Sequence, residues 1–335
     1  MPKALVTGGS GFIGSSLIRE LAERGYEVRA LLRKTSDTSH LEGIRYERAD
    51  GDLSNLDSLK KAVEGVDVVF HLAGVVRAPN RDGFFRHNAE GTRLLVEAIA
   101  EVNPGIRRFV LVSSLAAAGP APSLEKPNLE SHEATPVSLY GESKLQGERE
   151  ALKFKDRIPV TIIRPPMVYG PRDKDIFVVI RTVSRRMMPM IQGATPDGSK
   201  YYSLIHVSDL CRGIIQAGEA QLEKVPSGEV FYLTDGGLYT YRELLLAMSA
   251  SLGVRAFELK IPAFVVSLAA AAASALGAMM GKTFPLNRDK LNEILPDYWI
   301  CSTDKAKLML GYSPKYNLST GMADAIQWYR ERKWI

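Results

Sequence analysis

TGGSGFIG, residues 7–14, is the stretch of sequence that decides the fold we expect for this chain. It follows a short apolar run at residues 4–6, which reads as a buried strand. After it, apolar residues recur at helical spacing over residues 12–24. A strand, a glycine-rich turn and a helix in this order open a dinucleotide-binding α/β unit.

Three glycines of this stretch indicate a binding site for a dinucleotide. Gly8 permits the tight turn, Gly11 lets backbone N–H groups approach a pyrophosphate, and Gly14 lets the helix pack closely on the strand. The phosphates then lie at the positive end of the helix, beside Phe12 and Ile13. The alternative, an ordinary turn with incidental glycines, does not account for this complete context.

The end of the second strand, residues 27–32, decides which dinucleotide is favoured. An NAD site usually carries Asp or Glu there to accept hydrogen bonds from the ribose. This chain has Arg33 and Lys34 instead, and its next carboxylate is Asp37. A guanidinium can bind a 2′-phosphate with paired hydrogen bonds, whereas a carboxylate repels it. NADP(H) is therefore favoured, and NAD(H) stays open if Arg33 is only a solvated residue.

A second motif, YGESK at residues 140–144, places a phenol and an ammonium one helical turn apart. A tyrosine has a pKa near 10 in water, and we expect the Lys144 ammonium, with the positive nicotinamide of the oxidised cofactor, to lower it by stabilising the phenolate. Ser114 ends a strand-like run at residues 109–112, and ligand sites of open α/β sheets lie at such ends. Its hydroxyl can orient a substrate oxygen towards Tyr140.

Further strand-like runs alternate with helical segments, which predicts a parallel, doubly wound Rossmann sheet. The runs lie at residues 44–47, 66–71 and 160–163, and residues 230–233 add a late strand to the same sheet. We assign residues 1–169 and 206–237 to the dinucleotide-binding domain, and residues 170–205 and 238–335 to a smaller, interleaved substrate-binding part. The proline-rich residues 119–136 form a loop that we expect to cover the active site.

With these motifs the chain resembles the extended short-chain dehydrogenase/reductases, the NAD-dependent epimerase/dehydratase family. The resemblance runs over nearly the whole length. The further matching segments are DGDL at residues 50–53, HLAG at 71–74, NAEGT at 88–92, RPPMVYGP at 164–171 and HVSDL at 206–210.

The resemblance implies a set of site residues. It makes Ser114, Tyr140 and Lys144 the catalytic triad, with Asn88 as a supporting position. The expected cofactor-binding residues are Gly8, Gly11, Phe12, Ile13, Gly14, Arg33, Lys34, Asp52, Leu53, Leu72, Ala73, Gly74, Tyr140, Lys144, Pro165 and Val168.

Within the family, two substitutions argue against a nucleotide-sugar substrate. Sugar dehydratases usually carry Thr-Asp-Glu where this chain has Ser114-Leu115-Ala116, and many epimerases carry Tyr-Gly where it has Ala118-Gly119. The tract SSLAAAG at residues 113–119 looks more like that of 3β-hydroxysteroid dehydrogenase-like and dihydroflavonol reductase-like members.

Residues 261–281 form an uncharged run bounded by Lys260 and Lys282. Its length would suit a membrane span, but alanines dominate it. Three readings stay open: a buried or lid-forming helix of the substrate part, a helix lying on a membrane surface, and a span. The run resembles the hydrophobic segment of 3β-hydroxysteroid dehydrogenase-like members.

The composition of the chain limits its class, its location and its partners. The chain has 335 residues, 45% of them apolar, and only two cysteines, which fits a globular protein of a reducing compartment. The first strand begins within five residues of Met1, so we expect no signal peptide and a cytoplasmic location. The five histidines lack metal-ligand spacing, and a net charge of +5 does not indicate a nucleic-acid partner.

The sequence thus predicts an NADP(H)-preferring oxidoreductase that interconverts a secondary alcohol and a ketone on a lipophilic small molecule. One alternative is a nucleotide-sugar epimerase, which returns the hydride to the opposite face and consumes no cofactor. A cofactor-sensing regulator without catalysis is a third reading, disfavoured because the triad is complete. The family also implies a homodimer paired through helices that flank the tyrosine.

Overall fold

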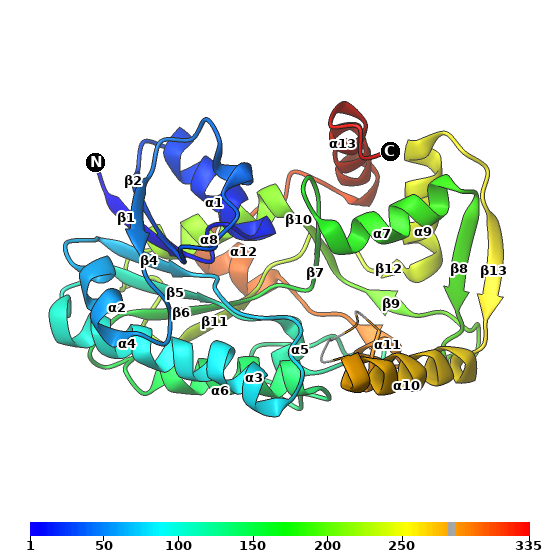
Figure 1. Ribbon diagram of the computed structural model, residues 1–335, viewed down its shortest axis with the longest axis horizontal. Coiled ribbons are helices and arrows are strands. Elements are labelled where there is room, and N and C mark those ends of the chain that lie inside the picture. Colours follow the sequence, from blue (N-terminus) through cyan, green and yellow to red (C-terminus); the bar gives the residue numbers. More distant parts are fainter. Residues whose placement is uncertain (281–283, 285) are drawn as a thin grey trace.

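The computed structural model describes residues 1–280, 284 and 286–335 of the chain. A seven-stranded parallel sheet fills the half that contains the N-terminus (Figure 1), with the order β11-β6-β5-β4-β1-β2-β3. Its strands are β1 (Lys3–Thr7), β2 (Glu27–Leu32), β3 (Glu47–Asp50), β4 (Val68–His71), β5 (Arg108–Val112), β6 (Val160–Arg164) and β11 (Glu229–Tyr232). The predicted Rossmann sheet is confirmed, with the late strand β11 at its edge beside β6.

The third strand lies further along the chain than the prediction at residues 44–47. Strand β3 begins at Glu47 and ends at Asp50, which pairs with Leu32 of β2. The apolar side chains of Ile44 and Tyr46, which produced the strand-like pattern, pack onto the core before the strand begins. An edge strand needs no apolar run, and β3 has the charged sequence ERAD.

Helices cover both faces of the sheet because successive strand residues point to opposite sides. Ala4 and Val6 of β1 join the apolar cluster of one face, and Leu5 joins that of the other. The first cluster includes residues of α1 (Phe12–Glu23), α8 (Val207–Glu219) and α12 (Asp304–Leu310). The second includes residues of α2 (Leu56–Val63), α4 (Gly91–Val102) and α6 (Leu139–Leu152). Helix α12 thus packs with the sheet, although the predicted division places it in the substrate part.

Short elements connect the strands near the carboxyl edge of the sheet. They are a 3₁₀ turn (Ser39–Leu41), α3 (Arg81–Phe85), a π-helical turn (Arg86–Glu90) and α5 (Leu115–Ala118).

The other half of the molecule is built from segments 167–206 and 239–331, apart from α12, and has its own apolar core. Helices α7 (Lys174–Ser184), α9 (Tyr241–Leu252) and α13 (Leu318–Glu331) pack around Ile180, Met248 and Met322. Its strands are β7 (Met167–Tyr169), β8 (Met187–Ile191), β9 (Tyr201–Tyr202), β10 (Leu204–His206), β12 (Tyr239–Thr240), β13 (Phe257–Ile261) and β14 (Tyr298–Trp299). The remaining helices are α10 (Ala263–Met280) and α11 (Arg288–Ile294).

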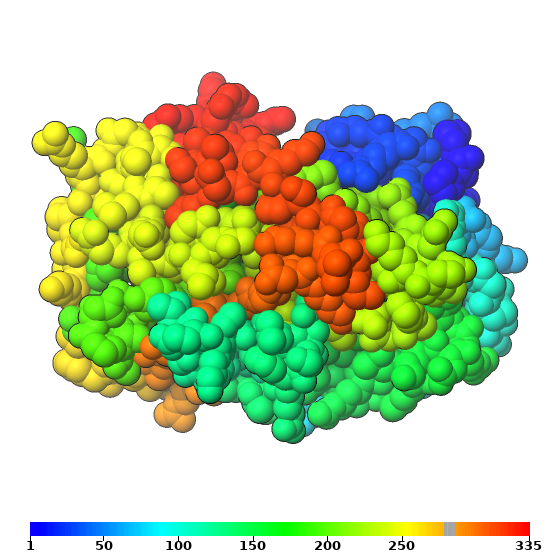
Figure 2. All heavy atoms as spheres, turned by 180° about the vertical axis from the view of Figure 1, so that it is seen from behind, coloured from blue at the N-terminus to red at the C-terminus, as the bar shows by residue number. Residues whose placement is uncertain are grey.

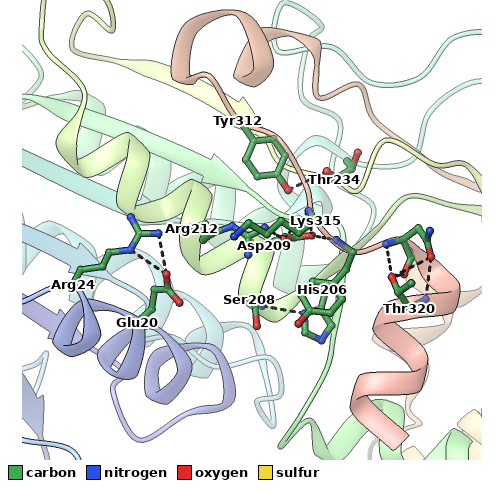
Figure 3. A network of polar contacts seen from close by, with 12 residues as sticks. Glu20, Arg24, His206, Ser208, Asp209, Arg212, Thr234, Tyr312, Lys315 and Thr320 are labelled. Atoms are coloured by element: carbon green, nitrogen blue, oxygen red, sulfur yellow. Dashed lines mark hydrogen bonds and ion pairs between the residues drawn. The ribbon is translucent and has the colours of Figure 1, made fainter. Parts of the chain in front are cut away.

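A buried carboxylate joins the two halves (Figure 3). Asp209, in the first turn of α8, is fully buried and accepts hydrogen bonds from the backbone N–H groups of Lys315 and Tyr316. It also pairs with Arg212. The segment that leads into α13 is therefore fixed to the helix that follows β10, because a buried carboxylate must be paired.

The loop at residues 119–136 takes a different course from the one expected. Ala121 N–H donates to the carbonyl of Tyr298 at 2.8 Å, and Asn128 N–H donates to the carbonyl of Ile300 at 3.1 Å. The Glu130 carboxylate accepts from the N–H of Tyr232 at the sheet edge. Figure 2 shows this blue-green loop on the rear face, below the orange stretch that contains α12. None of its residues lines the cavities described below.

Helix α10 covers most of the predicted uncharged run, whose last residue, Gly281, lies outside the described residues. Val266 and Ala270 are buried, whereas Phe264 and Leu268 are 71% and 69% exposed. The helix therefore lies on the surface and is not buried, whereas the lid-forming and membrane-surface readings stay predictions. Among the helices in the described ranges, none has the length and hydropathy needed to cross a bilayer.

Candidate active site

Two cavities lie along the carboxyl edge of the sheet. The large cavity, of about 670 Å³, reaches from Arg33 past the glycine loop to Tyr140. The small cavity, of about 280 Å³, extends from the same loop towards Asp52. Such a crevice outside the strand ends is where open α/β sheets bind ligands.

The predicted residues meet at these cavities with one exception. The large cavity is lined by Gly8, Gly11, Phe12, Ile13, Gly14, Arg33, Leu72, Gly74, Asn88, Ser114, Tyr140, Lys144, Pro165 and Val168. The small cavity adds Asp52, Leu53 and Ala73. Lys34 is exposed and lines neither.

The glycine loop has the shape that a pyrophosphate requires. Gly8 has a φ of +73°, and a Cβ on Gly14 would lie 2.1 Å from the Gly8 carbonyl oxygen, so neither position accepts a side chain. Gly11 caps α1 without a side-chain hydrogen bond, and the first helical bond runs from Ser15 to Gly11. The preceding N–H groups of the first turn have no partner within the helix and are available to an anion. The loop therefore fits the phosphates of a dinucleotide.

One arginine and two carboxylates line the cavities near the end of β2. Arg33 lines both cavities and, among the described residues, forms no ion pair. The Asp52 carboxylate accepts hydrogen bonds from the hydroxyl and N–H of Ser54, which lower its pKa. Asp37 lines the large cavity. Its carboxylate accepts a hydrogen bond from the backbone N–H of Ser39, two residues further along the same turn. Arg33 is thus a cation without an ion-pair partner in the described part of the chain, shared by the two cavities.

Ser114 and Tyr140 meet because two short elements pack tightly. Ser114 caps α5 at the end of β5, and its Oγ accepts from the N–H of Ala116 at 3.1 Å. Tyr140 lies in the first turn of α6, next to Gly141, whose missing Cβ would lie 2.3 Å from the carbonyl oxygen of Ala116. The glycine of YGESK therefore brings the catalytic helix against the residues that follow the serine.

Lys144 is held from the strand that carries the serine. Its Nζ is buried and donates to the carbonyl oxygen of Val112 at 2.8 Å. Burial lowers the pKa of Lys144 to about 8, and the Glu148 carboxylate opposes this change. Because an ammonium has three N–H bonds, two stay available to other acceptors.

The half-buried Tyr140 phenol is protonated at neutral pH. Burial raises the pKa of Tyr140 to about 12, a hydrogen bond with Ser114 opposes the shift, and the Glu293 carboxylate adds to it. The lowering of the tyrosine pKa expected from Lys144 together with an oxidised nicotinamide concerns the protein with its cofactor bound, and it stays a prediction.

Asn88 supports the catalytic helix from a π-helical turn. Its Nδ2 donates to the hydroxyl of Ser143 at 2.9 Å and to the carbonyl of Val75 at 3.0 Å. Its Oδ1 accepts from the N–H of Val75 at 2.8 Å. A π-helical turn inserted between helices is frequent at functional sites. Asn88 thus fixes α6 to the loop that follows β4.

His71 belongs to the core beneath the cavity. Its Nδ1 lies 2.6 Å from Thr7 Oγ1 and its Nε2 lies 3.0 Å from Thr92 Oγ1. Burial lowers its pKa to about 3, so the ring is neutral. The described residues contain no group of three potential metal-binding side chains.

Several cavity residues were missed by sequence reasoning. Arg172 and Lys174 reach the large cavity from the start of α7, and Arg77 reaches it from the loop after β4. Ser113 Oγ is buried there without a partner in the described part of the chain. Asp289 and Glu293 of α11 contact the start of the catalytic helix. Ser113 lies in the SSLAAAG tract and Arg172 directly follows the RPPMVYGP segment, so those two motifs were the available signal. Arg77, Asp289 and Glu293 lie in segments without a motif, so the sequence held no signal for them.

This combination of a phosphate-binding glycine loop with a Ser-Tyr-Lys set in one cavity defines a dinucleotide-dependent enzyme of the extended short-chain dehydrogenase/reductase class. Residues 4–232 match the model of the NAD dependent epimerase/dehydratase family. The chain belongs to that family.

Relatives and solved structures align over almost the whole chain. A ceramide reductase of Caulobacter vibrioides is 27% identical over 337 residues, covering 98% of this chain and 95% of the relative. Sterol demethylase protein B of Methylococcus capsulatus is 30% identical over 345 residues, covering 99% of both chains. The solved structure of MoeE5 with UDP-glucuronic acid and NAD has a TM-score of 0.77 at 25% identity, covering 98% of this chain and 99% of that one.

Proposed function

We propose that the protein is an NADP(H)-preferring reductase or dehydrogenase that interconverts a secondary alcohol and a ketone on a lipophilic substrate. The observation that carries the proposal is the shared cavity, which has the glycine loop at one end and Ser114, Tyr140 and Lys144 at the other. A nucleotide bound along the loop therefore extends towards the proton-transfer residues.

Each residue of the triad has a defined task in this proposal. A bound nicotinamide supplies the hydride for reduction and accepts it in the reverse direction. Ser114 donates a hydrogen bond to the substrate carbonyl oxygen, and Tyr140 gives that oxygen its proton. Lys144, fixed by the carbonyl of Val112, stabilises the phenolate that remains and binds the nicotinamide ribose.

The preference for NADP(H) rests on Arg33. Its guanidinium lines both cavities, and no described carboxylate neutralises it. The nearest carboxylate of the loop, Asp37, is engaged by Ser39. A 2′-phosphate gives Arg33 a negatively charged partner, whereas the two ribose hydroxyls of NAD offer only neutral acceptors.

The lipophilic character of the substrate rests on two independent points. Relatives that align with the whole chain are named for ceramide and sterol, both apolar molecules. Helix α10 also exposes Phe264 and Leu268, which favours contact between this half of the molecule and a membrane surface. The second candidate, a nucleotide-sugar epimerase, is favoured by the match to a structure that holds UDP-glucuronic acid.

The experiment follows NADPH oxidation and NADP⁺ reduction by the purified protein with two groups of compounds. One group contains long-chain, steroid-like and flavonoid-like ketones and alcohols, and the other contains nucleotide sugars. Net consumption of NADPH with a lipophilic ketone supports the proposal. Conversion of a nucleotide sugar without net cofactor consumption contradicts it and identifies an epimerase.

A further inference from the structure

Arg172 has an unusual backbone conformation beside the large cavity. It follows the Gly170-Pro171 turn, directly before α7, and its φ is +77°. Side chains other than glycine rarely adopt this left-handed region, because the Cβ crowds the following carbonyl. Such a residue persists only where its surroundings hold it, and it is a reason to look for a function.

The guanidinium of Arg172 is held in place but lacks an anion. Its Nη2 donates to Ser16 Oγ on α1 at 2.7 Å, and its Nε is buried without a partner. No described carboxylate lies within 4 Å of it, and the charges that act on it from Arg19 and Arg332 are positive. A partly desolvated cation among like charges is unfavourable unless an anion completes the site.

The surroundings of the cavity indicate which anion would complete it. Arg172 shares the cavity with Phe12, Ile13 and Gly14, the first turn of α1, whose N–H groups have no partner within the helix. Ser16, which anchors the guanidinium, lies on the next turn of the same helix. Lys174 lines the same cavity and adds a second cation. The carboxylates that also line it are engaged, because Asp175 pairs with Arg77, and Asp37 and Asp173 accept from backbone N–H groups. Arg172 therefore shares one cavity with the turn that the glycine loop offers to a pyrophosphate.

We propose that Arg172, anchored by Ser16, donates to a pyrophosphate oxygen of the bound dinucleotide and closes its binding site from the substrate-binding half. This assignment rests on the proposed cofactor and adds a residue that the glycine motif does not contain. It differs from the role of Arg33, which would contact only the 2′-phosphate. Arg172 therefore serves NADP⁺ and NAD⁺ alike, whereas Arg33 distinguishes them.

Calorimetric titration of the purified, full-length protein with NADP⁺ and with NAD⁺ tests this assignment. Arg172→Gln keeps a polar side chain with an N–H donor but is shorter than arginine and lacks the charge, so it removes the guanidinium that Ser16 holds. We expect it to weaken both cofactors by the same factor, about tenfold to a hundredfold, as is typical of one charge-assisted hydrogen bond. Arg33→Gln should weaken NADP⁺ alone, and Arg19→Gln, a nearby arginine that lines neither cavity, should change neither affinity.

The melting temperature of the cofactor-free protein separates binding from stability. Because Arg172 lacks an anion there, Arg172→Gln should melt no lower than the wild type. Unchanged affinities, or a loss confined to NADP⁺, would overturn the assignment. If Arg172→Gln does not fold, Arg172→Lys replaces it, and equal losses for both cofactors are again expected. A wild-type protein that binds neither dinucleotide refutes the proposed function itself.

Discussion

Tyr140 and Lys144 are perturbed in opposite directions by the same cause. Burial raises the pKa of Tyr140 to about 12 and lowers that of Lys144 to about 8, because desolvation disfavours both charged forms. The phenol is thus kept as a proton donor, while the ammonium stays charged at neutral pH. In the proposed oxidative direction, we expect Lys144 and the positive charge of an oxidised nicotinamide to stabilise the phenolate.

The first prediction concerns the phenol oxygen. Tyr140→Phe removes the proton donor without changing the volume of the ring, so kcat should fall by about a hundredfold to ten-thousandfold. Calorimetry should show nearly unchanged affinity for NADP⁺, because the glycine loop is untouched. Tyr201→Phe is the matched control, since Tyr201 stacks on Tyr298 and lines neither cavity. Turnover at the wild-type rate in Tyr140→Phe would exclude the proposed mechanism.

At the scale of elements, α11 acts on the catalytic helix through two carboxylates. Asp289 accepts from the N–H of Leu139 at 2.8 Å, and Glu293 accepts from the hydroxyl of Ser138 at 2.7 Å. Negative charges at a helix N-terminus are stabilising, so both side chains favour the position of α6. The same charge on Glu293 disfavours the Tyr140 phenolate.

This arrangement predicts a change in the pH profile of the reaction. Alcohol oxidation needs the phenolate, so its rate should rise with pH through the apparent pKa of Tyr140. Glu293 on α11 is the charged group that raises this pKa, and the hydrogen bond with Ser114 lowers it. Glu293→Gln removes a negative charge and should lower that pKa, moving the rising limb of kcat/KM for oxidation to lower pH.

The control is Glu331→Gln, which changes an exposed residue of α13 and should leave the rising limb in place. A Glu293→Gln profile identical to the wild type, or moved to higher pH, contradicts this coupling.

The sequence-based predictions that were wrong concern a strand and a loop. Residues 44–47 read as a strand because apolar side chains were taken as evidence of pairing, yet Ile44 and Tyr46 pack on the core from a loop. The loop at residues 119–136 was expected over the active site because it links Ser114 to α6. Its backbone hydrogen bonds instead run to residues 298–302, a segment that no local pattern connects with it.

At the scale of the molecule, a feature could be predicted from the sequence when it depends on interactions between residues that are close together in the chain. The sheet, the glycine loop and the Ser-Tyr-Lys set could be predicted because each depends on neighbouring residues, such as a strand followed by a turn. The other half depends on contacts between distant segments, such as those of Asp209 with Lys315 and Tyr316. Glu293 reaches the start of α6 through such a contact, and the sequence alone could not place it there.

The largest unexplained feature of the whole molecule is the exposed apolar face of α10. We define this α10 face as Phe264, Val265, Leu268, Leu276 and Met280, each at least 41% exposed, on a helix with no charged residue. Exposed Lys260 precedes it, and exposed Arg288 and Lys290 follow on α11. An apolar face with a basic border suits a membrane that contains anionic lipids.

A lipophilic substrate dissolved in such a membrane gives the last prediction. Phe264→Ser with Leu268→Ser should reduce binding to vesicles containing anionic lipid about a hundredfold, because burying two large apolar side chains contributes roughly 3 kcal/mol. Sedimentation with vesicles measures this loss, and kcat/KM for a vesicle-embedded ketone should fall with it. Turnover of a water-soluble ketone should not change, since neither residue lines the cavities.

The control is Leu308→Ser, because Leu308 is an 81% exposed leucine on α12. If the double variant binds vesicles as tightly as Leu308→Ser does, the α10 face is not a membrane-binding surface.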